Sequence, residues 1–351
     1  MKPWRLELMG GPRDAGAGRE AWLLSERADF WVLSAGGGAL LLAMAAVLLW
    51  HGEYEIAAAD LLLGELHLGA TYQAIVQRRL WRRMPLDVLA MPLAIAVAAY
   101  ALWLADNSLA VTTAILYVGA WHRGRQGLGI ARHFQRGAGG PVSPAHRWLL
   151  DSAFYLPMIA TIAHYGTIAP TDEGEEFWHL WVPPDMLWLL GMAAVASVLA
   201  YLGWTVGRTA APEQMPRHSE GAAGVAVHPC ERWLVLAHAV GFGTAYVFGA
   251  WTSSLVLVLA IHHEVQYLYF TYAVGRQAGN VDGQGVGPEL RRLARFASWP
   301  VIGLASWVVC KATGLGALDP FLTAGLLGHY WLDGRIWTSR ARRRARSESR
   351  T

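Results

Sequence analysis

Charged side chains and cysteines are both scarce in this chain. Charged residues make up 16% of the 351 residues and hydrophobic residues 54%, whereas a soluble domain averages about 25% charged residues. The shortage of charge argues against an ordinary soluble domain and favours a protein surrounded largely by lipid. The formal net charge of +3 is modest. Loops expected on the cytoplasmic side account for it, so we expect no nucleic-acid partner.

The low cysteine content excludes cysteine-based sites. The two cysteines, Cys230 and Cys310, fall near opposite faces of the bundle predicted below, so we expect no disulfide, no cysteine-based zinc motif and no iron–sulfur cluster. A cleavable signal peptide is also not expected. Residues 1–28 are charged and glycine-rich, and no short apolar stretch there precedes a cleavage site.

Long apolar runs dominate what remains. A membrane-spanning helix needs roughly 20 mostly apolar residues, and about ten runs reach this length. We therefore predict an all-α, polytopic transmembrane helical bundle over residues 29–337, preceded by a cytoplasmic segment, 1–28, and followed by a basic cytoplasmic tail, 338–351. The runs are 29–50, 56–77, 86–105, 108–130, 147–168, 185–207, 231–250, 254–275, 296–313 and 316–337.

Basic residues cluster in alternate connections between these runs, as in 78–83 after the second run. The intervening connections are neutral or acidic, as in 172–176. Because short cytoplasmic loops are enriched in Lys and Arg, both termini are predicted to be cytoplasmic. Trp148 then lies near an inner helix end and Trp181 near an outer one, as expected for aromatic residues at membrane interfaces.

The eighth run, 254–275, contains the strongest polar signal. Its centre reads His262-His263-Glu264-Val265-Gln266. Ionisable side chains at this depth are rare and by default indicate function. Neighbouring histidines on a helix point about 100° apart, so both can ligate one centre only if it lies in the groove between them. Alternatively, one ligates and the other supports it.

Three other runs carry histidines at a similar depth. His67 lies in the second run, His122 in the fourth and His329 in the tenth, where Asp333 follows one helical turn later. His133 shares a helical face with His122 and lies at or beyond the inner surface. Polar side chains from four separate runs are therefore predicted to meet inside the bundle.

Each of these residues also has a structural interpretation. A lone buried histidine is commonly a hydrogen-bonded core residue, and His164 and His238 are the weaker candidates for which this applies most directly. The fourth run can also leave the membrane near its middle and continue as a cytoplasmic helix. Asp333 can form an ion pair with Arg125 or Arg335 at the inner edge.

A metal site explains the polar residues together. Neutral imidazole suits iron, copper and zinc, and sites of this kind are built in bundle cores. Iron is expected, as one or two ions, with copper, zinc or haem as alternatives. The predicted metal ligands are His67, His122, His133, His262, His263 and His329, and the residues predicted to ligate, bridge or orient in catalysis are Glu264, Gln266 and Asp333.

Two sequence motifs resemble those of a known group of proteins. His262-His263-x-x-Gln266-Tyr267 and His329-Tyr330-x-x-Asp333-Gly334-x-Ile336-Trp337 resemble motifs of uncharacterised bacterial polytopic membrane proteins, which implies a location in the bacterial inner membrane. The general picture is more loosely similar to histidine-rich membrane desaturases and hydroxylases, although their HxxxH and HxxHH boxes are absent. That similarity implies oxidative chemistry.

The function predicted from these observations is that of an integral-membrane metalloenzyme. We expect an oxidoreductase of the oxygenase, hydroxylase or desaturase type, acting on a lipid-like or otherwise hydrophobic substrate and supplied by an electron donor. Two alternatives use the same residues. A proton-coupled transporter would use intramembrane ionisable groups as a relay, and an electron-transfer protein would use two histidines as axial haem ligands.

Overall fold

A computed structural model describes residues 22–33, 46, 67–72, 75, 80–137, 142–168, 180–206, 208, 227–248, 254–279 and 325–333. All the secondary-structure elements in these residues are helices, in agreement with the predicted all-α class. Their bounds are α1 Glu26–Leu33, α4 Leu80–Arg83, the π-helical turn η1 Leu86–Ala90, α5 Met91–Leu104, α6 Ser108–Gly137, α7 Pro144–Ile168, α8 Pro184–Thr205, α9 Pro229–Phe248 and α10 Ser254–Gly279. Residues 67–72 and 325–333 are also helical.

Five predicted runs agree closely with the observed helices. The runs 86–105, 147–168, 185–207, 231–250 and 254–275 correspond to η1 with α5, α7, α8, α9 and α10. The fourth run differs, because α6 is a single helix of 30 residues that continues past 130 to Gly137. No proline interrupts it, and it ends where the glycine-rich stretch before Pro141 begins.

The other four predicted runs lie largely or wholly outside the described residues. The run 29–50 is described at α1 and Ala46, the run 56–77 at 67–72 and Ile75, and the run 316–337 at 325–333. The run 296–313 lies outside them. The number of spans and the domain boundaries therefore stay predictions.

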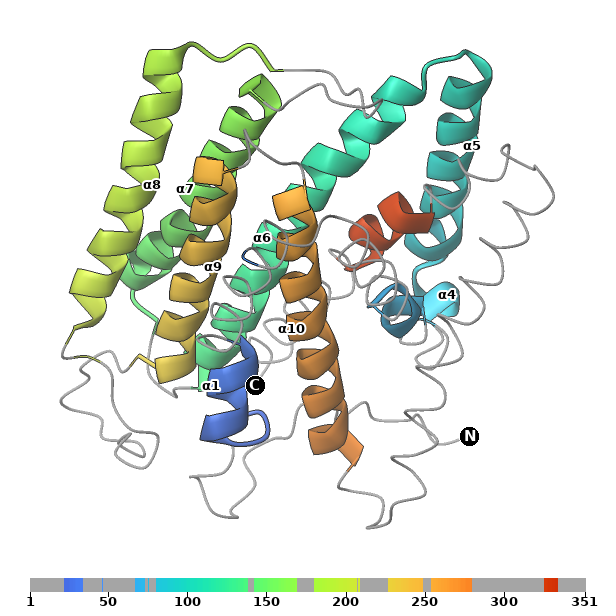
Figure 1. Ribbon diagram of the computed structural model, residues 1–351. Helices are drawn as coiled ribbons and strands as arrows, with labels where there is room; N and C mark the ends of the chain where they lie inside the picture. Colours follow the sequence, from blue (N-terminus) through green and yellow to red (C-terminus); the bar gives the residue numbers. More distant parts are fainter. Residues whose placement is uncertain are drawn as a thin grey trace.

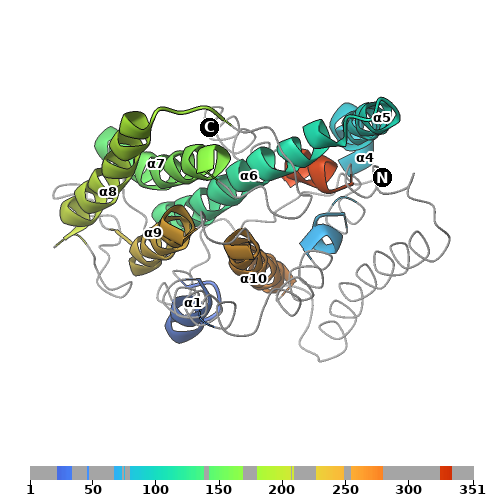
Figure 2. The same cartoon turned by 45° about the horizontal axis from the view of Figure 1, so that its top comes forward.

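Helix α6 occupies the middle of the bundle. It runs obliquely across the molecule (Figure 1) and packs against α5, α7, α9 and α10. Figure 2 shows α7 and α10 on opposite sides of it. Because α6 packs against helices on both of its sides, its side chains can reach sites on either side of the bundle.

Two glycines of α6 permit these close contacts. A Cβ atom at Gly124 would lie 2.3 Å from Met158 Sδ, and one at Gly127 would lie 3.0 Å from Phe154 Cε1. Both neighbours belong to α7, so the absent side chains let the two helices approach, as expected of small residues at helix interfaces. At Gly129, no described residue lies within 4 Å of the added atom.

A buried carboxylate ties α1 to the bundle. Asp29 is fully buried and accepts a hydrogen bond of 2.7 Å from the Leu23 backbone N–H at Oδ2. Its other oxygen accepts hydrogen bonds from Leu24 N–H at 3.3 Å and from the Tyr269 hydroxyl of α10 at 2.5 Å. The segment before α1 is therefore folded back, and α1 is anchored beside α10.

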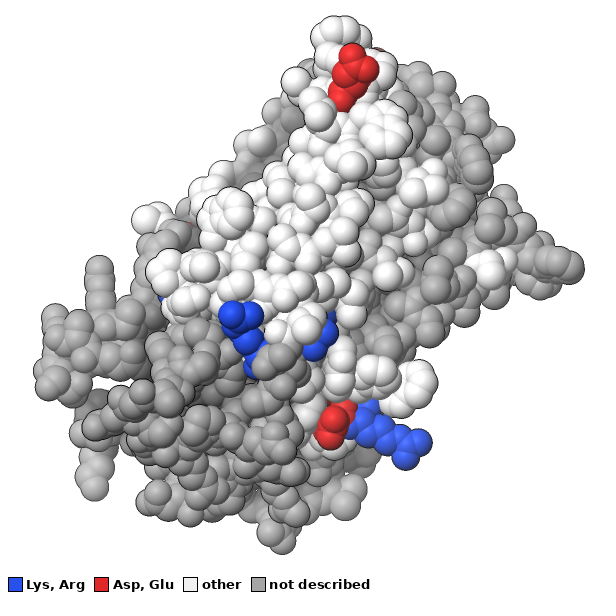
Figure 3. All heavy atoms as spheres, turned by 90° about the vertical axis from the view of Figure 1, so that its left-hand side faces the viewer, with Lys and Arg blue, Asp and Glu red and all other residues white. Residues whose placement is uncertain are grey.

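The exterior of the bundle is apolar where α5 and α8 face outward. Exposed side chains include Leu93, Val97 and Leu104 on α5 and Trp188, Leu189 and Leu199 on α8. Figure 3 shows a broad uncharged band on the side formed by α8, with charged residues at its two ends. Two helical stretches, Leu86–Leu104 and Pro184–Thr205, are long and apolar enough to cross a membrane.

Candidate metal centre

Four buried side chains converge at one point. His67, His122, His329 and Asp333 each offer one ligand atom, and these atoms all lie within 4.8 Å of one another. His122 comes from the middle of α6, His67 from the helical segment 67–72, and the other two from 325–333. The group could hold a metal ion.

Asp333 Oδ2 is nearly equidistant from the three imidazoles. It lies 3.7 Å from His67 Nε2, 3.8 Å from His122 Nε2 and 3.8 Å from His329 Nε2. These separations exceed ordinary hydrogen-bond lengths. They approach the spacing of about 3.3–3.6 Å that separates neighbouring ligands around a tetrahedral ion with bonds of about 2.0–2.2 Å.

The Asp333 carboxylate is held in place from its other side. The Thr71 hydroxyl donates to Oδ1 at 2.8 Å, and the Tyr267 hydroxyl of α10 donates to the same oxygen at 3.1 Å. Because these bonds fix one oxygen, the second oxygen faces the imidazoles. Ligating carboxylates are supported in this manner in known metal sites.

Several polar atoms in this group lack hydrogen-bond partners in the part of the chain that the structure describes. They are His67 Nδ1 and Nε2, His122 Nε2, His329 Nδ1 and Asp333 Oδ2. All four side chains are at most 7% exposed. A buried polar atom left unpaired costs about 1–3 kcal/mol. Three nitrogens and one oxygen directed at one ion would offset that cost.

A layer of aromatic rings surrounds the four ligands. Tyr267 stacks on His67, with ring centroids 4.0 Å apart and planes 7° from parallel. Tyr330 lies against His122 at 4.6 Å. His263 contacts the rings of His67 and His122 at 4.9 Å and 5.0 Å. It is thus a fourth imidazole beside the three of the ligand group, as expected if one histidine of the adjacent pair supports the site.

The other predicted site residues lie at different places. His262 is buried and lines a neighbouring cavity, and Gln266 Nε2 donates to the Leu33 carbonyl at 2.9 Å. Glu264 is buried at 8% exposure but is not one of the four. His133 is half-buried and contacts Phe270 through its ring. It lies three turns, or about 16 Å, along α6 from His122.

The two weaker candidates have local partners. His164 stacks on Tyr246 with ring centroids 4.2 Å apart. His238 Nε2 donates to the Phe154 backbone carbonyl at 2.9 Å. Neither belongs to the group of four ligands, and both agree with the structural interpretation of a buried histidine.

The sequence interpretation missed residues at this site and elsewhere. Thr71 follows His67 by four residues and so shares its helical face, which is the signal that could have identified it. A second buried polar cluster also escaped notice, because its members come from three helices. His146 Nε2 lies 2.5 Å from Glu231 Oε1, and the Tyr201 hydroxyl donates to the same oxygen at 2.8 Å.

Comparison of the chain with protein-family models, with curated proteins and with solved structures finds no match.

Proposed function

We propose that this protein is an integral-membrane metalloenzyme whose ion is held by His67, His122, His329 and Asp333. The observation that supports this proposal is the convergence of three imidazole nitrogens and one carboxylate oxygen within 4.8 Å. Side chains remote in sequence, each buried at 7% exposure or less, meet around one point. Buried ionisable groups need a compensating interaction, and a bound cation supplies it.

The ligand set favours a first-row transition metal. Nitrogen and carboxylate ligands suit iron, copper and zinc, and iron is the redox-active metal associated with mixed histidine–carboxylate sites. A single ion fits four ligand atoms that share one centre. A single ion is favoured over haem, because the imidazole rings lie against one another with centroids 4.5–5.9 Å apart and the ligand atoms converge on one point, whereas axial haem ligands face each other across a porphyrin.

The surroundings of the site favour a hydrophobic substrate. The centre lies inside a helical bundle whose outward faces on α5 and α8 are apolar. A lipid-like molecule can reach such a bundle from the bilayer. We therefore propose oxidation of a lipid-like substrate of the inner membrane, with an electron donor as partner. The bound iron would supply the redox chemistry, while the protein positions the substrate and excludes water.

A direct assay tests this function. Purified, iron-loaded protein is incubated with lipids extracted from the host membrane, a reductant and oxygen, and lipid masses are compared before and after. The proposal predicts oxygen consumption and a new oxidised lipid that His122→Ala abolishes. Proton-coupled flux in proteoliposomes without any oxidised product would instead indicate a transporter.

A further inference from the structure

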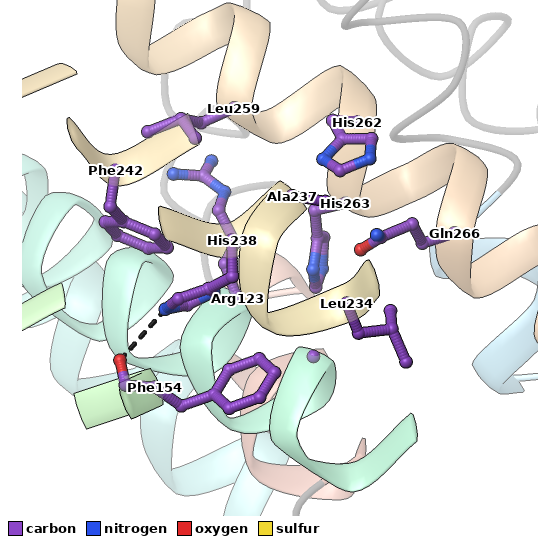
Figure 4. A pocket seen from close by; sticks show the side chains of 11 residues that line it. Arg123, Phe154, Leu234, Ala237, His238, Phe242, Leu259, His262, His263 and Gln266 are labelled. Atoms are coloured by element: carbon purple, nitrogen blue, oxygen red, sulfur yellow. Dashed lines mark hydrogen bonds between the residues drawn. The ribbon is translucent and has the colours of Figure 1, made fainter. Parts of the chain in front are cut away.

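A small cavity adjoins the candidate metal centre. It has a volume of about 30 Å³ and lies between α6, α9 and α10 (Figure 4). His263, which contacts the rings of His67 and His122, forms one part of its wall. Apolar residues such as Leu234, Phe242 and Leu259 form much of the remaining lining. Four further polar side chains also line the cavity: Arg123, His238, His262 and Gln266.

Two of these polar side chains are not committed elsewhere. Arg123 of α6 has no ion pair or hydrogen bond with any other residue that the structure describes. His262 of α10 is only 6% exposed, and its Nε2 has no hydrogen-bond partner among those residues. Arg123 and His262 thus line one cavity with a guanidinium that lacks a counter-charge among the described residues and a buried imidazole nitrogen that lacks a partner among them. Such groups are costly inside a membrane protein unless a ligand completes the arrangement.

The other two polar residues are already engaged. His238 donates its Nε2–H to the Phe154 carbonyl, as the dashed line in Figure 4 marks. A neutral ring then leaves Nδ1 as an acceptor, which does not attract an anion. Gln266 donates to the Leu33 carbonyl. The groups that remain for a ligand are therefore the guanidinium of Arg123 and Nε2 of His262, which can donate when it carries the ring proton.

We propose that this cavity binds a carboxylate group, with Arg123 and His262 as its hydrogen-bond donors. A guanidinium matches the two oxygens of a carboxylate, and one negative charge balances one arginine. The volume corresponds to about two water molecules, which suits a planar carboxylate better than a tetrahedral phosphate. The identification of this carboxylate as the head group of the substrate rests on the proposed function. The existence of the binding site rests on the cavity alone.

The carboxylate has two sources, an amphiphile or a small free acid, and one titration distinguishes them. Octanoate and acetate, each labelled with ¹³C at the carboxyl carbon, are added to the detergent-solubilised full chain, and the carboxyl resonance is followed by NMR. Saturable binding of octanoate at least tenfold tighter than that of acetate identifies an amphiphile. Equal affinities identify a small free acid. Octanol, which lacks the carboxylate, should compete at least tenfold more weakly than octanoate.

Variants of α6 test the donor. Arg123→Gln should weaken octanoate binding at least tenfold, whereas Arg125→Gln should change it less than twofold. Arg125 is the matched control, because it is exposed two residues away on the same helix and does not line the cavity. His262→Phe removes the second donor and should also weaken binding. If Arg123→Gln fails to fold, the comparison of octanoate with octanol in the wild-type chain still tests whether the cavity binds a carboxylate.

The same titration on chelator-treated wild-type protein separates this proposal from the metal centre. The protein donors alone should bind octanoate, so the affinity should survive removal of the metal within about threefold, which corresponds to about 0.7 kcal/mol. If the protein lacks metal as purified, before any chelator is added, and still binds octanoate through Arg123, the proposed function is contradicted but the carboxylate site is not. Octanoate that fails to saturate, octanol that competes equally, or unchanged affinity in Arg123→Gln would overturn the site.

Discussion

Asp333 Oδ2 lies 3.7 Å from His67 Nε2, although the two residues come from nearly opposite ends of the chain. Both residues are 3% exposed. The distance is too long for a hydrogen bond, yet the two groups are held face to face, because Thr71 and Tyr267 fix the other carboxylate oxygen. The pair is thus arranged around a point between them rather than bonded directly to each other.

The hydroxyls that hold Asp333 should tune metal affinity. Tyr267→Phe and Thr71→Val each remove one donor to Oδ1 with little change in shape, so we expect metal affinity to fall about 10- to 100-fold. Competition with a chelator of known affinity measures this. Tyr246→Phe is the control, since its hydroxyl bonds to the Leu187 carbonyl away from the site. Equal affinities in all the variants would show that Asp333 needs no support.

Removing the metal should destabilise the folded protein. A ligand that binds only the folded state adds about 2.7 kcal/mol at a concentration 100 times its dissociation constant. Chelation should therefore lower the midpoint of thermal unfolding, and added iron should restore it. In Asp333→Asn, which removes the negative charge but keeps the size, added iron should have little effect. An identical response in Asp333→Asn would exclude the carboxylate as a ligand.

Much of the helical pattern was predictable, because apolar runs of spanning length are a strong local signal. The bounds of α8 and α10 agree with the predicted runs within four residues. The extent of α6 was less predictable, since its polar second half lacks the apolar signal that marked its first half. Glycine and proline after Gly137 provided the better indication of where it ends.

The site was predictable in part, because ionisable side chains in apolar runs are conspicuous. The histidines at 67, 122 and 329 and Asp333 could be identified one by one. Which member of the pair His262 and His263 faces the group depends on helix rotation, which follows from packing against α6 and not from the local sequence. Thr71 was missed, because hydroxyls are common in membrane helices and its place on the helical face of His67 was the one local indication of its role.

The second buried cluster should support the fold rather than the metal. Glu231 is fully buried, so Glu231→Ala would leave His146 and Tyr201 without their shared acceptor. Breaking a buried pair costs about 3–5 kcal/mol, and the midpoint of thermal unfolding should fall clearly while metal content stays unchanged.

A partly exposed ion pair provides the control for that experiment. Asp151 bonds to Arg132 at 2.6 Å with both side chains partly exposed, and such pairs contribute about 0–1 kcal/mol. Asp151→Ala should therefore lower the unfolding midpoint much less than Glu231→Ala. Equal shifts in the two variants would show that burial does not decide the strength of these pairs.

The predicted orientation can be tested with two exposed tryptophans. Trp181 is 87% exposed before α8, and Trp148 is 70% exposed near the start of α7. In a background with Cys230→Ala and Cys310→Ala, we expect an impermeant maleimide to label Trp181→Cys in intact cells. Trp148→Cys should react only after the membrane is permeabilised. Labelling of both positions from one side would contradict the assigned topology.

The metal content of the purified full-length protein tests the central claim most directly. Elemental analysis should find close to one transition-metal ion, expected to be iron, per chain. His122→Ala and His329→Ala should each lose most of it, while His164→Ala, which alters a histidine outside the group, should retain it. Wild-type protein that remains folded and active without metal, or His122→Ala that keeps its full metal content, would contradict the account.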